Sequence, residues 1–188
     1  MMVTSNKLQL ASNLNTSPGM LVNLASDEND DVRYEVAWNI KIPSQAMEIL
    51  AKDRSSDVRE ALAWNPATVA NILDILANDT NHLVRYAAAN NANTSTRALA
   101  SLAHDEHYGI RVAVASRDST PENILNGLAS DKNENVRGAV ARNATAPTEV
   151  LEKLAFDKFW SVRNAARSTL RNADQKADTE TPELAMHK

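Results

Sequence analysis

A Val-Arg or Ile-Arg pair recurs along the chain at an interval of 26 residues, without a single insertion. The arginines of these pairs are Arg33, Arg59, Arg85, Arg111, Arg137 and Arg163. Other columns keep the same register: an alanine four residues after most of the arginines, a Leu-Ala pair later in the unit, and an aspartate six residues before each arginine. Chance does not hold this many columns in phase, and such a period is typical of stacked repeat architectures.

Each repeat unit has the pattern of two short helices. In 120-TPENILNGLAS-130 the apolar residues follow helical spacing, and Thr120 is predicted to cap the helix that begins near Pro121. The second helix, as in 136-VRGAVARN-143, is predicted to close at an asparagine in the left-handed conformation; this column holds Asn13, Asn39, Asn65, Asn91 and Asn143. A unit this small cannot bury its apolar stripe alone, so the sequence predicts an all-α solenoid.

The ends of the repeat array set the expected domain boundaries. Residues 1–26 are predicted to form an N-terminal capping partial repeat, in which Lys7 stands at the arginine position. Residues 27–170 are predicted to form the tandem repeat solenoid, and polar substitutions in its last unit suit a cap. Residues 171–188 are polar and are expected to form a flexible C-terminal tail.

Composition restricts the possible functions. The net charge of −4 argues against a general affinity for nucleic acid or for anionic membranes. The chain has no cysteine, which excludes disulfides, thiolate metal sites and cysteine-ligated clusters, and no cofactor is expected. No apolar run approaches the length of a membrane-spanning helix and the start lacks a signal-peptide core, so a cytoplasmic location is expected.

Three stretches, DVRYEVAWN, NVRGAVARNATAPTEVLEKLAFD and DVREALAWNPATVANILDILAND, closely resemble the repeats of the leucine-rich repeat variant family, which belongs with the HEAT-like helical repeats. The resemblance covers roughly residues 6–170. It implies a right-handed superhelix in which α-helices alternate with shorter, often 3₁₀, helices. The period here is longer than the family's usual one, so both helices are expected to be α. Some members carry an iron–sulfur cluster on cysteines, a function that a chain without cysteine does not inherit.

One stripe of the second helix is predicted to face outward. Counted from the arginine, the positions one before and two, three and six after share the core side, and the positions one and five after point away from it. The outward positions of the first three full units are Tyr34 with Trp38, Glu60 with Trp64, and Tyr86 with Asn90. They include four of the eight aromatic residues of the chain and are predicted to bind a partner. The alternative is that each tryptophan folds over the next loop and only shields it.

Three other groups of residues invite a functional interpretation. The arginine and aspartate columns predict a ladder of structural ion pairs across the loop between the helices, in preference to an anion-binding ladder. His104 and His107, in HDEHYG, are expected to lie in a solvated loop and not to bind a metal. The aromatic residues of 156-FDKFWS-161 are predicted to seal the last core layer, with self-association as the alternative.

These patterns predict a non-enzymatic scaffold that binds a protein or peptide, as a monomer or weak dimer, with no membrane contact. The chain has no nucleophile motif and no glycine-rich phosphate loop. The alternative is a HEAT-like nucleic-acid-binding protein or a DNA glycosylase-type enzyme, which needs a basic track. A spacer without any specific partner is the third possibility.

Overall fold

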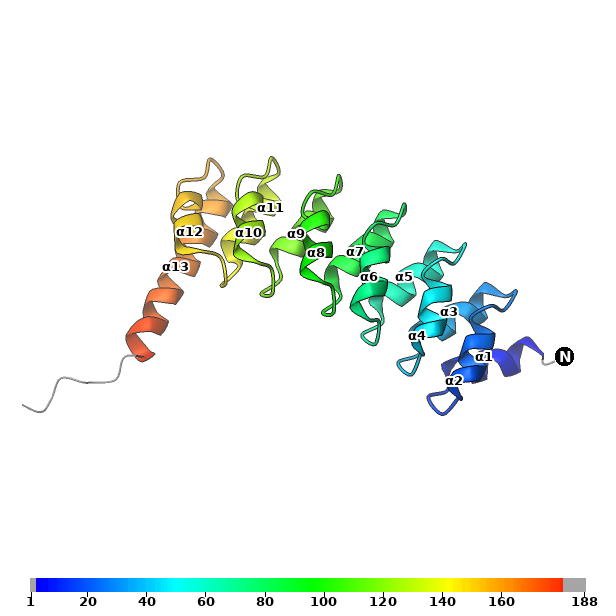
Figure 1. The fold of residues 1–188 in the computed structure, drawn as a ribbon. Helices are drawn as coiled ribbons and strands as arrows, with labels where there is room; N and C mark the ends of the chain where they lie inside the picture. Colours follow the sequence, from blue (N-terminus) through cyan, green and yellow to red (C-terminus); the bar gives the residue numbers. More distant parts are fainter. Residues whose placement is uncertain (1–2, 181–188) are drawn as a thin grey trace, which may run out of the picture. The chain divides into compact units, whose positions relative to one another are not determined.

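The chain is an alternation of short and longer α-helices. The computed structural model describes residues 3–180, in which every regular element is an α-helix (Figure 1). The short helices are α2 (Pro18–Leu24), α4 (Ser44–Leu50), α6 (Ala70–Leu76), α8 (Thr96–Leu102), α10 (Glu122–Leu128) and α12 (Thr148–Leu154). The longer ones are α1 (Thr4–Ser12), α3 (Asp30–Trp38), α5 (Ser56–Trp64), α7 (His82–Asn90), α9 (Tyr108–Ala115), α11 (Glu134–Arg142) and α13 (Trp160–Glu180). The prediction that both helices of each repeat are α is therefore confirmed.

The helices form two compact units, Met1–Ile110 and Arg111–Lys188, and the division falls within α9. In the first unit the longer helices α1, α3, α5 and α7 pack each against the next, and the short helices α2, α4 and α6 each pack on the longer helices before and after them. In the second unit α11 and α12 both pack on α13. Each unit is thus a stack of two-helix repeats, as in an α-solenoid. The handedness of the superhelix stays a prediction.

The core consists of the apolar columns that the repeat makes periodic. The predicted inward positions of the third full unit, Val84, Ala87, Ala88 and Asn91, are all buried. The leucine and alanine of the Leu-Ala column are buried in every repeat, as in Leu76 and Ala77. Among residues 3–180, no helix combines the length and the hydrophobicity that crossing a membrane requires.

The asparagine column connects neighbouring repeats, and the predicted left-handed helix closure is wrong. Asn65 ends α5 with an extended backbone (φ −65°, ψ 122°), and residues 3–180 contain no positive φ. Its amide Nδ2 donates to the carbonyl oxygens of Ala37 (2.7 Å) and Asn39 (3.1 Å), one repeat earlier. Its Oδ1 accepts the N–H of Ala67 at 2.8 Å. The same bridge is made by Asn39, Asn91 and Asn143, so the column is selected for an inter-repeat bond.

The predicted N-cap role of Thr120 is also wrong. Pro121 itself occupies the N-cap of α10 and has no side-chain oxygen to offer. The buried Thr120 hydroxyl turns back and donates to the carbonyl oxygen of Val114, at 2.6 Å, in the last turn of α9. Thr16 and Thr68 make the equivalent bond in their repeats, so the column satisfies a helix C-terminus and not an N-terminus.

The last helix extends further than expected. Residues 171–180 were predicted to belong to a polar tail, but they continue α13 to Glu180. Thr169 stands where other repeats have asparagine, and its Oγ1 donates to the Ala141 carbonyl at 2.7 Å. Threonine has no amide oxygen that could accept the backbone N–H of the residue two positions later, so the helix does not end at Thr169. The next proline in the sequence is Pro182. Residues 181–188 of the predicted flexible tail lie outside the described residues.

Asn65→Asp tests the inter-repeat bridge. The substitution keeps the shape of the side chain but replaces the donor Nδ2 with an oxygen that faces two carbonyl oxygens. We expect the free energy of unfolding, measured by urea denaturation at pH 7, to fall by about 3 kcal/mol. The control, Asn23→Asp on the exposed surface of α2, should change it by less than about 0.5 kcal/mol. Equal losses in the two variants would contradict a structural role for the bridge.

Candidate functional site

A ladder of six ion pairs, five of them bidentate, ties the longer helices α1 to α11 to the repeats that follow them. Arg59 of α5 donates from Nε to Asp79 Oδ2 (2.6 Å) and from Nη2 to Asp79 Oδ1 (2.9 Å). Its Nη1 donates to the backbone carbonyl of Asp53 at 2.6 Å. The predicted structural pairing is therefore confirmed, but the carboxylate belongs to the following repeat; the aspartate six residues before the arginine contributes its backbone oxygen. The rungs are Lys7–Asp27, Arg33–Asp53, Arg59–Asp79, Arg85–Asp105, Arg111–Asp131 and Arg137–Asp157.

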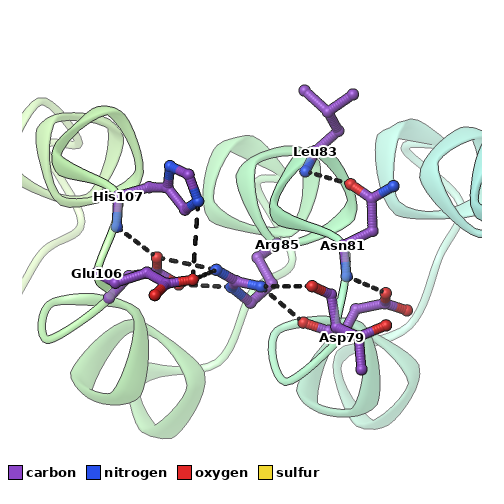
Figure 2. Close-up of polar contacts among 8 residues, drawn as sticks. Asp79, Asn81, Leu83, Arg85, Glu106 and His107 are labelled. Carbon is purple, nitrogen blue, oxygen red and sulfur yellow. Dashed lines mark hydrogen bonds and ion pairs between the residues drawn. The ribbon is translucent and has the colours of Figure 1, made fainter.

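Each ladder aspartate also closes the loop of its own repeat. Asp79 Oδ1 accepts the N–H of Asn81 (2.8 Å), and Asn81 in turn caps α7 by accepting the N–H of Leu83 (2.8 Å), as Figure 2 shows. Burial by itself would raise the pKa of Asp79. The hydrogen bonds from Arg59 and from the Asn81 N–H outweigh that effect and hold the pKa below its ordinary value. The carboxylate is therefore ionised and fixed in position at neutral pH.

The six residues predicted to point outward lie on three successive longer helices, which the ladder ties together. Tyr34 and Trp38 lie on α3, Glu60 and Trp64 on α5, and Tyr86 and Asn90 on α7. The four aromatic side chains are exposed to a similar degree: 38% for Tyr34, 41% for Trp38, 37% for Trp64 and 40% for Tyr86. We call these six residues the aromatic strip. Their outward placement agrees with the helical geometry from which it was predicted.

The rings of the aromatic strip meet in two edge-to-face pairs. Tyr34 and Trp38 pack within α3, with ring centroids 6.4 Å apart and planes at 65°. Trp64 of α5 packs on Tyr86 of α7, with centroids 6.1 Å apart and planes at 70°. The second pair therefore links two repeats. Trp64 Nε1 also donates to Glu60 Oε1 at 3.4 Å.

A cleft opens between the two tryptophans. It has a volume of about 250 Å³ and is lined by Tyr34, Trp38, Asp57, Glu60, Ala61 and Trp64. The structure thus brings four of the six predicted residues together. Tyr86 joins them only through its contact with Trp64, and Asn90 is turned to its own helix, where its Nδ2 donates to the Tyr86 carbonyl at 2.8 Å.

The prediction from sequence missed Asp57. This residue lines the cleft and also a neighbouring hollow of about 210 Å³, which Asp30, Asp31 and Tyr34 help to form. Its position in the sequence could have predicted this placement. Asp57 precedes Glu60 by three residues on the same helix, and residues at that spacing share a helix face.

A larger hollow, of about 680 Å³, lies over the first loops of the same unit. Three of the charged residues that line it are already engaged: Arg33 binds Asp53, and Asp27 binds Lys7. This hollow lies over the ladder, and the ladder residues in its lining already have their partners.

His104 and His107 lie on the surface, as expected for a solvated loop. His107 stacks on His82, with ring centroids 4.4 Å apart. Its Nε2 lies 3.7 Å from Glu106 Oε1 (Figure 2). His104 Nδ1 lies 3.0 Å from the carbonyl oxygen of Ala100. Within residues 3–180 no three histidine, aspartate or glutamate side chains are grouped to hold a metal ion.

The prediction that 156-FDKFWS-161 seals the core is wrong. Phe156 is 84% exposed and Trp160 is 71% exposed. Phe156 stands at a loop position that other repeats fill with exposed residues, and Trp160 is the first residue of α13. Val162 and Ala166 fill the core in their place. Self-association through this cluster stays a prediction.

Comparison with known proteins gives fold likeness only. No family model matches the chain, and no curated protein matches it with significance. A solved leucine-rich repeat variant is 21% identical over 88% of this chain and 81% of its own, with a TM-score of 0.39. YibA of Escherichia coli is 18% identical (90% and 93% covered, TM-score 0.47). A designed armadillo repeat protein, solved with the peptide (KR)4, is 20% identical (89% and 90% covered, TM-score 0.38).

The structural neighbours therefore include a leucine-rich repeat variant and other helical repeat proteins, which agrees with the resemblance seen in the repeats. Every one of these TM-scores lies below 0.5, so they carry no inference about what this chain binds.

Acid should weaken the ladder, and Asp79→Asn should remove part of that effect. Because the folded state depresses the pKa of Asp79, the rung stabilises the fold above the unfolded pKa of about 4 and loses this contribution as pH falls through the folded value. At pH 7 the variant should lose about 3 kcal/mol of unfolding free energy. Measured from pH 7 to pH 3, its curve should approach that of the parent at the acid end. Asp118→Asn, at an exposed carboxylate, should follow the parent throughout.

Single tryptophan substitutions distinguish a free surface from a shield. A tryptophan that covers a core costs roughly 3–5 kcal/mol when truncated to alanine. Trp38→Ala should cost less than about 2 kcal/mol, because its ring contacts a tyrosine of its own helix. Trp64→Ala should cost about 1 kcal/mol more, because its ring pair with Tyr86 joins two repeats and its Nε1 donates to Glu60. Urea denaturation that gave core-like losses for both would favour the shielding interpretation.

Proposed function

We propose that this chain is a non-enzymatic scaffold that holds a protein or peptide partner on the aromatic strip. The observation that carries the proposal is the cleft between Trp38 and Trp64, whose rings stand exposed on adjacent repeats. Tryptophan and tyrosine bury large areas at low entropic cost and are enriched among residues that dominate binding energy.

The supporting helices are held in place before any partner arrives. The rung between Arg33 and Asp53 ties α3 to the loop ahead of α5, and the Asn65 bridge ties the end of α5 back to α3. A surface that is ordered in advance loses less conformational entropy on binding. The cleft volume of about 250 Å³ is below the roughly 300–1,000 Å³ of small-molecule sites, which suits one side chain of a larger partner.

The charges around the strip disfavour the nucleic-acid alternative. Asp57 and Glu60 line the cleft, and a phosphate placed there would meet two carboxylates. Residues 1–110 contain 13 acidic and 8 basic side chains, a net of −5, and four of the eight basic ones are engaged in the ladder. Nucleic-acid binding needs the opposite balance.

The test is affinity capture with matched tryptophan variants. The parent chain, a Trp38→Ala/Trp64→Ala variant and a Phe156→Ala/Trp160→Ala variant would be immobilised and exposed to lysate of the source organism. We expect the parent and the second variant to retain the same partner. The first should bind it at least about 30-fold more weakly, as the loss of one hot-spot tryptophan implies.

Circular dichroism on each variant checks that the fold is retained. Capture that is equal in all three proteins would contradict a binding role for the strip. Capture by none of them would favour a spacer without a specific partner.

A further inference from the structure

We propose that the cleft between Trp38 and Trp64 takes an arginine side chain from an extended, basic segment of the partner. This inference rests on the proposed function and adds the chemistry of the group that is bound. It follows from the aromatic walls of the cleft, from the charge of its rim and from its size.

The walls are suited to a cation. Tyr34, Trp38 and Trp64 all line the cleft, and the π face of tryptophan attracts cations more strongly than that of any other side chain. Elsewhere the chain already makes this kind of contact: the Arg137 guanidinium lies 5.5 Å from the Phe159 ring centroid, and the Lys158 ammonium 5.3 Å from it. The tryptophans of the cleft have no such cation within the described part of the chain.

The rim carries negative charge that no ion pair within residues 3–180 neutralises. Among residues 3–180, neither Asp57 nor Glu60 forms an ion pair; Glu60 accepts only the indole N–H of Trp64. The ladder aspartates, by contrast, are all bound to arginine or lysine. Both of these rim carboxylates have room to accept hydrogen bonds from a cationic group placed between the rings.

Arginine fits this arrangement better than lysine does. The guanidinium is planar and weakly hydrated, so it can stack on an indole and still donate to carboxylates from its edge. The lysine ammonium is a compact, strongly hydrated charge and gives up water less readily. The cleft of about 250 Å³ has space for such a side chain.

The neighbouring hollow indicates that the partner segment carries a second cation. It shares Tyr34 and Asp57 with the cleft and adds Asp30 and Asp31, with no basic residue in its lining. The two hollows are therefore contiguous along α3 and α5. An extended segment with a basic residue beside the arginine would fill both.

The chain's three tryptophans make the test direct, because each gives one indole N–H signal in an NMR spectrum of the ¹⁵N-labelled full chain. The probe is the peptide Gly-Ser-Gly-Arg-Gly-Arg-Gly-Ser-Gly. Its matched control carries citrulline, which has the shape of arginine without the charge, at both arginine positions. A third peptide carries lysine there.

We expect the arginine peptide to shift the Trp38 and Trp64 signals saturably and to leave that of the exposed Trp160 in place. The citrulline peptide should bind at least about tenfold more weakly, which corresponds to the loss of one favourable charge interaction. The double variant Asp57→Asn/Glu60→Gln should lose affinity for the arginine peptide to the same extent. The control variant Glu149→Gln/Glu152→Gln should keep it. Lysine should fall between arginine and citrulline.

Equal binding of the arginine and citrulline peptides, or equal shifts at Trp160, would overturn the inference. A second experiment distinguishes failure of this inference from failure of the proposed function. Peptides are selected from a random phage library for binding that requires Trp38 and Trp64. Selected peptides without arginine or lysine would leave the strip as a binding surface for another chemistry. If no peptide of any composition required the two tryptophans, the proposed function would fall with the inference.

Discussion

The rest of the structure depends on the bidentate bonds that Arg33, Arg59, Arg85, Arg111 and Arg137 each make with the aspartate of the following repeat. The side chains of Arg33 and Asp53 are each only about 5% exposed, so the ion pair is stable only because its hydrogen bonds are complete. Two parallel bonds join the guanidinium to the carboxylate, and two backbone carbonyls accept from the remaining nitrogen, Nη1. The aspartate is in turn held by a loop N–H. Because one carboxylate closes its own loop and binds the preceding repeat, an inserted residue would disrupt both. This double role explains why the 26-residue spacing holds without exception.

A second polar connection, the asparagine bridge, works at the other end of the same helices. In α5, Arg59 acts near the N-terminus and Asn65 at the C-terminus, so the helix is fixed to its neighbours at both ends. The apolar columns between them fill the core. The two outward positions take part in none of these bonds. They are free to vary, and in the first three full repeats they carry the aromatic strip.

The sequence predicted what depends on local periodicity and missed what depends on the choice of neighbour. Core columns and the exposed stripe follow from the angle between successive helix residues, and these predictions hold. The carboxylate partner of Arg59 was not accessible in this way. In a 26-residue array, the aspartate six residues before an arginine and the one twenty residues after it belong to one column, so the sequence alone does not choose between Asp53 and Asp79. The amide of Asn65 is a similar case, because its bonds reach back a whole repeat.

Departures from the columns have different meanings at the ends and in the middle of the array. Lys7 replaces arginine in the first repeat, and Thr169 replaces asparagine in the last. Each still makes a bond to the adjacent repeat, so both are adaptations of the scaffold to its ends. Trp38 and Trp64 are not explained in this way, because α3 and α5 have a packed helix on either side. The core beneath these two helices is filled by other residues, and the tryptophans stand at the most variable position of the repeat. Packing of the repeats therefore does not account for them. This is why we propose recognition of a partner as the reason for the tryptophans.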